Sequence, residues 1–308
     1  MSGSTASPEP ASGGIVPTLA ELIGLRALAQ GRRTARLGRH GAQGHALSNL
    51  RGRGMEYAES REYAIGDDAR HIDWRLTARS GKAHTKLFQA ERERLTLVVA
   101  DTSPALYFGT RMRFKSVQAA RAGALAVWLA VRDGDRIAAL RGSAQEPPVP
   151  PASGQRGALR VLDALVRWYA RPPADDAGLP VALDHARRLL RPGSRLIVLA
   201  DPASVLAVPA ERWAGVVQHT DAVALLLTDP LERHPPAARL PFATEGGRQE
   251  LALDAAAVRQ RWKQAFDAPL DAALELLRRQ RVRAMPLSCD APDDAWLGLL
   301  DRPKGRMR

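Results

Sequence analysis

Three aspartates stand directly after short apolar segments of the chain, a place where α/β proteins gather their chemistry. Asp101, Asp201 and Asp229 each follow such a segment, and Ser103 lies two residues after Asp101. An aspartate and a serine at this spacing, in a tight loop, can point the same way and offer hard oxygen ligands to Mg²⁺. The same two side chains can instead cap backbone amides of their loop, and Asp201 can be an ordinary turn residue before Pro202.

A second group of chemically capable residues lies between residues 55 and 93, where arginines and acids alternate around aromatic side chains. Ion pairs among them can be purely structural and lock the segment in place. The same residue types can form a recognition surface, because Arg, Tyr and Trp are favoured at interfaces. The spacing leaves both interpretations open. The residues are Arg61, Glu62, Tyr63, Gly66, Asp67, Asp68, Arg70, Asp73, Trp74 and Arg79.

Recognisable catalytic motifs are absent from the sequence. It has no glycine-rich phosphate loop ending in Gly-Lys-Ser/Thr and no Gly-x-Ser-x-Gly elbow. The seven histidines are scattered without the spacing of a zinc site. These absences argue against an enzyme, and the sequence alone assigns no catalytic residue.

The charge of the chain is strongly basic and unevenly distributed. The formal net charge is +12, and residues 24–54 contain seven arginines and no acid. Such a stretch can contact phosphate backbones, acidic lipids or an acidic protein surface, or it can simply be a solvated arm. The single cysteine, Cys289, and the lack of a signal-peptide pattern predict a cytoplasmic protein.

The elements that must position these residues follow an α/β pattern. Apolar runs predict strands at 95–100, 136–140, 195–200, 222–227 and 282–287. Amphipathic periodicity predicts helices at 114–131, 157–169, 181–190, 209–218, 254–281 and 292–300. We expect a doubly wound, mainly parallel sheet with helices on both faces. Ligands bind beyond the carboxyl ends of such strands, so Asp101 and Asp201 are predicted to share one crevice.

The chain before the first apolar strand divides into three predicted segments. Residues 1–17 are rich in Ser, Gly, Pro and Ala and are predicted to be disordered. A basic N-terminal arm at 18–54 follows, and in it Thr18 and Glu21 predict a capping box for a short helix. Residues 55–93 form a charged, β-rich segment with strands expected at 71–78 and 83–89, packed on a main domain at 94–303.

A longer pattern surrounds the ten charged and aromatic residues named above. It adds residues 52–57, 86–88, Glu91, Asp101, Phe108, Gly109, Lys115, 134–136 and 228–232. With this pattern, residues 45–300 resemble a bacterial family, the domain-of-unknown-function 58 family. That resemblance implies a von Willebrand factor A-like domain and a role beside MoxR-type AAA ATPases, in chaperone-like assembly or maturation of other proteins.

The resemblance also implies a degenerate metal-ion-dependent adhesion site. Asp101, Ser103 and Asp201 match the pattern of that site, whereas Ala105 replaces its second serine. The loop at 172–184, where its threonine is expected, contains neither Ser nor Thr. Mg²⁺ is therefore expected to bind weakly, because it demands near-ideal octahedral geometry.

These observations favour a non-enzymatic adaptor that binds a MoxR-type AAA ATPase. One alternative is a nucleic-acid-binding protein that uses the basic arm, although the arm lacks aromatic residues for base stacking. A Mg²⁺-dependent hydrolase that uses the aspartates is the other alternative.

Overall fold

The computed structural model describes residues 14–31, 55–64, 66–90, 94–244 and 247–301. These residues belong to two units. The main unit consists of Met1–Arg36 with Arg94–Arg308, and the signature unit consists of Leu37–Glu93. Residues 1–13 of the predicted disordered tail (1–17) and residues 32–54 of the predicted basic arm (18–54) lie outside the described residues. Residues 14–17 are described, and the Phe114 backbone N–H donates to the Gly14 carbonyl oxygen at 2.7 Å.

The main unit contains a six-stranded sheet in the order β10-β7-β6-β3-β4-β5. Its five parallel strands are the five apolar runs of the sequence. They are β3 (Leu95–Ala100), β4 (Arg136–Arg141), β6 (Arg195–Ala200), β7 (Asp221–Thr228) and β10 (Arg283–Ser288). The sixth strand, β5 (Val149–Ser153), pairs antiparallel with β4 at the edge of the sheet, where its two prolines are tolerated.

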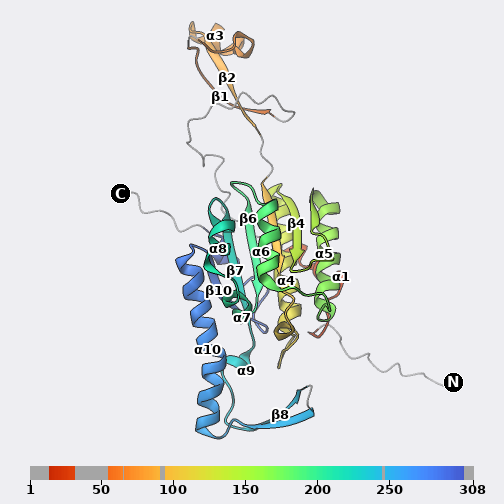
Figure 1. Cartoon of the computed structure of the whole chain (residues 1–308). Helices are drawn as coiled ribbons and strands as arrows, with labels where there is room; N and C mark the ends of the chain where they lie inside the picture. The colour runs from red at the N-terminus through yellow and green to blue at the C-terminus, as the bar shows by residue number, and fades with distance from the viewer. Residues whose placement is uncertain (1–13, 32–54, 65, 91–93, 245–246, 302–308) are drawn as a thin grey trace, which may run out of the picture. The chain divides into compact units, whose positions relative to one another are not determined.

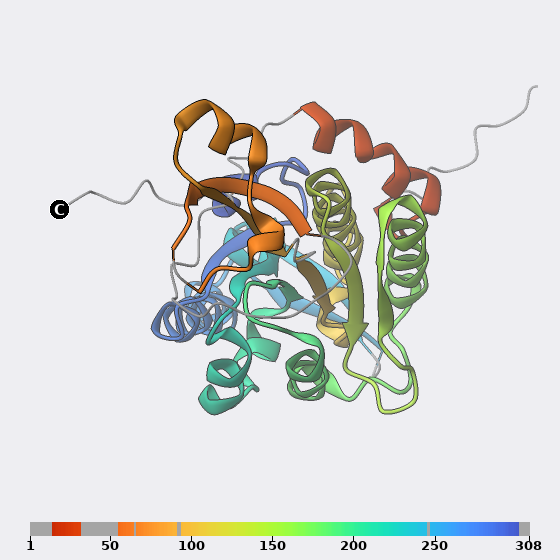
Figure 2. The same ribbon diagram turned by 90° about the horizontal axis from the view of Figure 1, so that it is seen from above.

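Helices cover both faces of this sheet (Figures 1 and 2). Val98 and Ala100 of β3 pack on one face, under α4 (Lys115–Asp133) and α5 (Gly154–Ala170). Leu97 and Val99 pack on the other, because successive strand residues point to opposite faces. That second face is covered by α6 (Gly178–Leu189), α7 (Pro202–Leu206), α8 (Ala210–Val217) and α10 (Ala256–Arg279). The expected α/β class with a mainly parallel sheet is confirmed.

Part of the segment predicted as a basic arm packs on the main unit instead. Helices α1 (Leu19–Gly24) and α2 (Arg26–Gly31) lie against α4. Trp128 Nε1 donates to the Leu22 carbonyl oxygen at 2.9 Å. Thr18 caps α1 as predicted, but Glu21 pairs with Arg121 at 2.5 Å rather than completing a capping box.

Some features of the main unit differ from those predicted from the sequence. Strands β8 (Arg239–Thr244) and β9 (Gly247–Ala252) form a hairpin outside the main sheet. Phe242 of β8 packs near Trp262 of α10, with the two ring centroids 5.6 Å apart. Figure 1 shows this hairpin and one half of α10 extending past α7 and α9 (Pro230–Arg233). The helix predicted at 292–300 shortens to a 3₁₀ turn, Leu297–Leu300.

The signature unit is an antiparallel hairpin that carries one helix. Strand β1 (Met55–Glu62) pairs with β2 (His84–Ala90), and α3 (Trp74–Ser80) lies between them in sequence. The strand predicted at 83–89 is confirmed, but the strand predicted at 71–78 is wrong. Asp73 caps that segment as a helix, and Gly81 ends it with a φ of +75°, a conformation that favours glycine.

Candidate functional site

The carboxyl ends of two neighbouring strands bring Asp101 and Asp201 together. Strands β3 and β6 are hydrogen-bonded in parallel, with Ala100 opposite Leu199. The Asp201 backbone N–H donates to Asp101 Oδ2 at 2.9 Å. Both aspartates are buried. They lie side by side at the carboxyl ends of β3 and β6, a place that we call the lip of the sheet, as the order of apolar strands predicts.

The Asp101 carboxylate is occupied by amides of its own chain. Its Oδ1 accepts the Ser103 backbone N–H at 3.0 Å, and its Oδ2 lies 3.4 Å from Ser103 Oγ. Burial raises the pKa of Asp101 to about 6, because the charged form loses solvation. The two residues make the loop-capping contacts that the sequence offered as an alternative to metal binding.

A lysine that the sequence analysis did not assign to the site supplies its positive charge. Lys115 is the first residue of α4 and is 2% exposed. Its Nζ lies 3.0 Å from Asp201 Oδ2 and 2.7 Å from Glu232 Oε1. Burial works against the charged amine, but the two carboxylates outweigh it and hold the pKa of Lys115 above its usual value. The lysine was noted only within the family resemblance, because its partners are 86 and 117 residues away in sequence.

The third strand-end aspartate holds a neighbouring loop. Asp229 accepts the Thr110 backbone N–H at 2.9 Å and the Thr110 hydroxyl at 2.6 Å. The Cys289 thiol donates to Asp229 Oδ2 at 2.9 Å. Burial and this carboxylate raise the pKa of Cys289, so the thiol stays protonated. Asp229 and Glu232 also form the capping box of α9.

These contacts do not fit a resident Mg²⁺ ion at the lip. The Lys115 ammonium already neutralises Asp201, and Asp101 accepts hydrogen bonds from two backbone amides. The loop where the threonine was expected contributes Asp176, which accepts a hydrogen bond from the Thr102 hydroxyl at 2.9 Å. Within the described part of the chain, no group of three His, Cys, Asp or Glu side chains is arranged to hold a metal. The metal-ligand roles of Asp101, Ser103 and Asp201 stay predictions.

The charged residues of the signature unit partly form the predicted network. Arg61 Nη2 lies 2.7 Å from Asp67 Oδ1, and the Tyr63 hydroxyl donates to the Asp67 carbonyl oxygen at 3.0 Å. A hydrogen bond from the Ala64 amide, the largest cause, and one from Arg61 hold the pKa of Asp67 below its usual value. Glu62 pairs with Lys82, 2.8 Å away, rather than with an arginine.

The remaining signature residues shape turns or face solvent. Gly66 has a φ of +107°, and Asp68 accepts the Arg70 backbone N–H at 3.0 Å. Arg70 and Arg79 are exposed. The packing of residues 55–93 on the main domain stays a prediction.

Comparison with known proteins places the chain in a family. It is 33% identical over 159 residues to the uncharacterized protein Mb1516 of Mycobacterium bovis and, to the same extent, to the uncharacterized protein Rv1480 of Mycobacterium tuberculosis. The match covers 51% of this chain and 50% of each relative, so the chain spans about half the length of these relatives. Residues 59–281 match the family described as "Protein of unknown function DUF58", and the chain therefore belongs to the DUF58 family.

Proposed function

We propose that this chain is a non-enzymatic adaptor that binds a protein partner through helix α3, and that the partner is a cytoplasmic MoxR-type AAA ATPase. The partner class comes from the family resemblance. The observation that carries the binding role is Trp74, the first residue of α3, whose side chain is 70% exposed.

An exposed tryptophan of this kind is unusual in this chain. The other five tryptophans are buried or half-buried. Tryptophan is enriched among the few residues that carry most of the energy of an interface, because its large apolar ring gains much free energy when a partner covers it. Trp74 therefore has the chemistry of an interface anchor.

Helix α3 holds this anchor in a fixed place. The Asp73 side chain accepts the Leu76 backbone N–H at 3.2 Å and also accepts the Ser60 hydroxyl at 3.2 Å. Thr77 Oγ1 accepts the His84 backbone N–H at 3.0 Å, which ties the helix to β2. A side chain presented on a preorganised element loses less entropy on binding than one on a loop.

The charges around Trp74 indicate what its partner offers. Arg75 and Arg79 are both exposed and are four residues apart, so they share one side of the helix. Arg70, just before the helix, is also exposed. The complementary surface is an apolar pocket bordered by acidic side chains.

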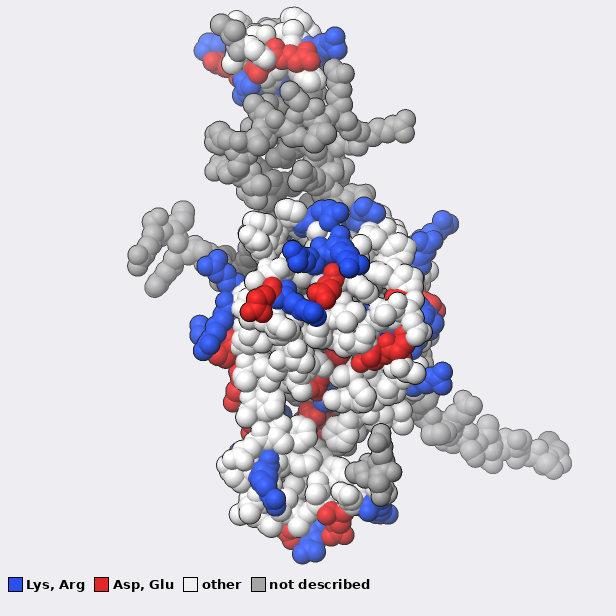
Figure 3. Space-filling view, in the orientation of Figure 1, with Lys and Arg blue, Asp and Glu red and all other residues white. Residues whose placement is uncertain are grey.

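The two other functions considered have weaker support. The strand-end carboxylates of Asp101, Asp201 and Asp229 are bonded to their own chain, which disfavours a hydrolase that needs them for a metal. Figure 3 shows basic side chains gathered near the upper end of the main unit, with acidic side chains directly beside them. This mixture of charges suits a polyanion less well than a purely basic surface does.

The proposal is tested by affinity capture with the full chain from a lysate of the bacterium that encodes it, in the presence of ATP and of ADP. We expect an AAA ATPase among the captured proteins. Trp74→Ala should lower its recovery by roughly thirtyfold, the effect of losing an interface anchor worth about 2 kcal/mol.

Met112→Ala is the matched control, since Met112 is 61% exposed but lies in the main unit. It should leave recovery unchanged. Failure to recover any AAA ATPase with either nucleotide contradicts the choice of partner. Equal recovery by wild type and Trp74→Ala contradicts the choice of surface.

A further inference from the structure

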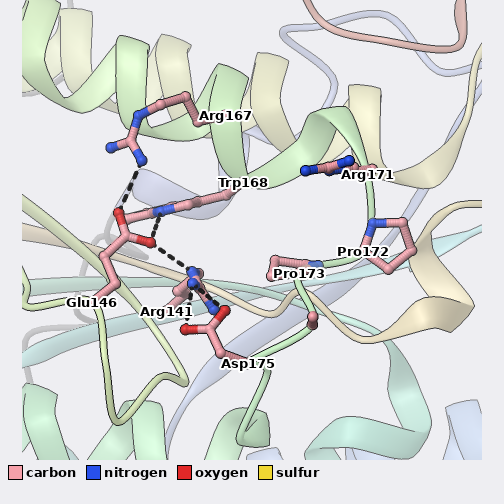
Figure 4. Close-up of a pocket in the computed structure, with 9 residues that line it drawn as sticks. Arg141, Glu146, Arg167, Trp168, Arg171, Pro172, Pro173 and Asp175 are labelled. Atoms are coloured by element: carbon pink, nitrogen blue, oxygen red, sulfur yellow. Dashed lines mark hydrogen bonds and ion pairs between the residues drawn. The ribbon is translucent and has the colours of Figure 1, made fainter.

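A cavity of about 500 Å³ lies where β4 ends, beside the last turn of α5 (Figure 4). This volume is in the range of sites that bind small molecules. None of its residues was singled out as a site residue from the sequence. Its walls are Arg141, Glu146, Arg167, Trp168, Arg171, Pro172, Pro173, Ala174 and Asp175.

Arg141 is the fixed centre of this cavity. Its side chain is 6% exposed. Its Nε donates to Glu146 Oε2 at 3.0 Å, and its Nη2 donates to both Asp175 oxygens at 2.7 and 2.9 Å. The third nitrogen, Nη1, is buried and has no hydrogen-bond partner. A buried guanidinium nitrogen without an acceptor is costly, so the wall of the cavity keeps one unsatisfied hydrogen-bond donor.

The surrounding wall is also held in place. Glu146 accepts hydrogen bonds from Trp168 Nε1 at 2.9 Å and from Arg167 Nη1 at 3.1 Å. The loop that carries Asp175 packs tightly against the end of β4, where a Cβ atom on Gly142 would lie 2.0 Å from the Gly178 carbonyl oxygen. The cavity is thus shaped before any ligand arrives, which favours binding.

Arg171 offers the free donors of the cavity. Figure 4 shows its guanidinium reaching over the cavity. It is exposed, and its side chain makes no hydrogen bond or ion pair with the residues that the structure describes. A guanidinium with all its N–H groups available can grip a planar carboxylate with two parallel hydrogen bonds.

The charges of the lining residues indicate which net charge a ligand of the cavity should carry. Three arginines and two carboxylates line the cavity, so it carries one excess positive charge. Burial would raise the pKa of Glu146, but hydrogen bonds from Trp168, Arg141 and Arg167 outweigh burial and lower it. The pKa of Asp175 is lowered by its hydrogen bonds from Ser143 and Arg141. With both carboxylates ionised, a monoanion neutralises the site, whereas a phosphate dianion leaves one negative charge uncompensated beside Glu146 and Asp175.

We propose that this cavity binds the carboxylate of an organic monoanion, with Arg171 as the gripping group and Pro172, Pro173 and Ala174 as the wall for its apolar body. The carboxylate can belong to a free organic acid or to the C-terminus of a polypeptide. The inference does not depend on the proposed adaptor function, because none of its residues lies in the signature unit.

Isothermal titration calorimetry on the full chain tests this site. The probes are benzoate, the neutral benzamide and the dianionic phenyl phosphate. We expect benzoate to bind, benzamide to show no binding, and phenyl phosphate to bind more weakly than benzoate. Arg171→Ala should weaken benzoate binding by about tenfold or more, or about 1.4 kcal/mol, and Arg171→Lys should weaken it less.

Arg160→Ala is the matched control, because Arg160 is an exposed arginine of α5 outside the cavity wall. It removes the same charge and should leave affinity unchanged. A second arm compares a short peptide that ends in a free carboxylate with the same peptide amidated. Tighter binding of the free peptide than of benzoate identifies a chain terminus as the source, and the reverse identifies a free acid.

Three results overturn the proposal. The first is equal affinity for benzoate and benzamide, and the second is an equal loss of affinity in Arg171→Ala and Arg160→Ala. Phenyl phosphate binding more tightly than benzoate is the third, because it contradicts the charge argument.

Discussion

Replacing Lys115 by methionine tests the electrostatics of the strand-end lip. Methionine keeps the length of the side chain but removes the ammonium that lies between Asp201 and Glu232. Both carboxylates are buried and lose their common partner. Breaking a buried ion pair by removing one member costs about 3–5 kcal/mol, because an uncompensated buried charge remains. For a unit of this size the melting temperature should fall by roughly 6–20 °C.

The loss should depend on pH in a definite direction. The raised pKa of Lys115 keeps the wild-type ion pair intact until pH rises past the usual lysine range, near 10. Burial already raises the pKa of Glu232 in the wild-type protein, and loss of the neighbouring ammonium in Lys115→Met raises it further. The folded variant then binds more protons than the unfolded chain as pH falls, so its deficit in unfolding free energy should shrink between about pH 8 and pH 5.

Urea unfolding of the full chain at several pH values measures this deficit. The double variant Lys115→Met/Glu232→Gln should recover part of the loss, because it removes one of the two stranded charges. Lys263→Met is the matched control at an exposed lysine of α10 and should stay within about 0.5 kcal/mol of wild type. A deficit below about 1 kcal/mol that does not change with pH would refute a charged, buried Lys115.

Three further predictions follow from other contacts. Asp101 has a pKa of about 6, above the usual 3.8, so its ionised form destabilises the fold above that range. In urea unfolding, the stability of wild type relative to Asp101→Asn should rise by about 2 kcal/mol as pH falls from about 7 to about 4, and a constant difference contradicts the raised pKa. Added Mg²⁺ should leave the melting temperatures of wild type and Asp101→Ala equally unchanged, whereas stabilisation of wild type alone would mean that the lip does hold the ion. Asp73→Ala should cost the signature unit about 1 kcal/mol through loss of the α3 cap, seen as faster amide exchange in residues 74–80 and not in α4.

The sheet is the part of this protein that the sequence predicts best. Apolar runs that end in aspartate mark β3 and β6, and their burial on both faces explains why hydrophobicity alone locates them. The same argument places Asp101 and Asp201 together at the carboxyl ends of the strands. Hydrophobicity does not locate the peripheral strands, because β5 contains two prolines and the β8–β9 hairpin lies outside the main sheet.

The alternation of apolar and polar residues around α3 led to the incorrect prediction of a strand. Ile72, Trp74 and Leu76 alternate with polar residues and suggest a half-buried strand. Trp74 is in fact exposed, so the alternation does not mark a buried face. The cap at Asp73 and the glycine at position 81 were the correct signals, since they bracket a helix.

The contacts that decide the chemistry of the strand-end lip and of the cavity beside α5 could not be predicted from local sequence. Lys115 reaches Glu232 across 117 positions of the chain, and Arg141 meets Asp175 across 34. Neither ion pair can be predicted from the hydrophobic periodicity or the local composition of the sequence. Only the packing of α4 and of the loop after α5 on the sheet ends brings these charges together.

No helix in the described part of the chain has the length and hydropathy to cross a bilayer.

Photo-crosslinking at position 74 is the most direct test of the adaptor account. The full chain carries Trp74→benzoylphenylalanine, with Met112→benzoylphenylalanine as the control, and the adducts are identified by mass spectrometry. We predict an adduct with an AAA ATPase from position 74 and not from position 112. Adducts that lack an AAA ATPase, or the same adducts from both positions, would contradict the claim that α3 is the surface that binds the partner.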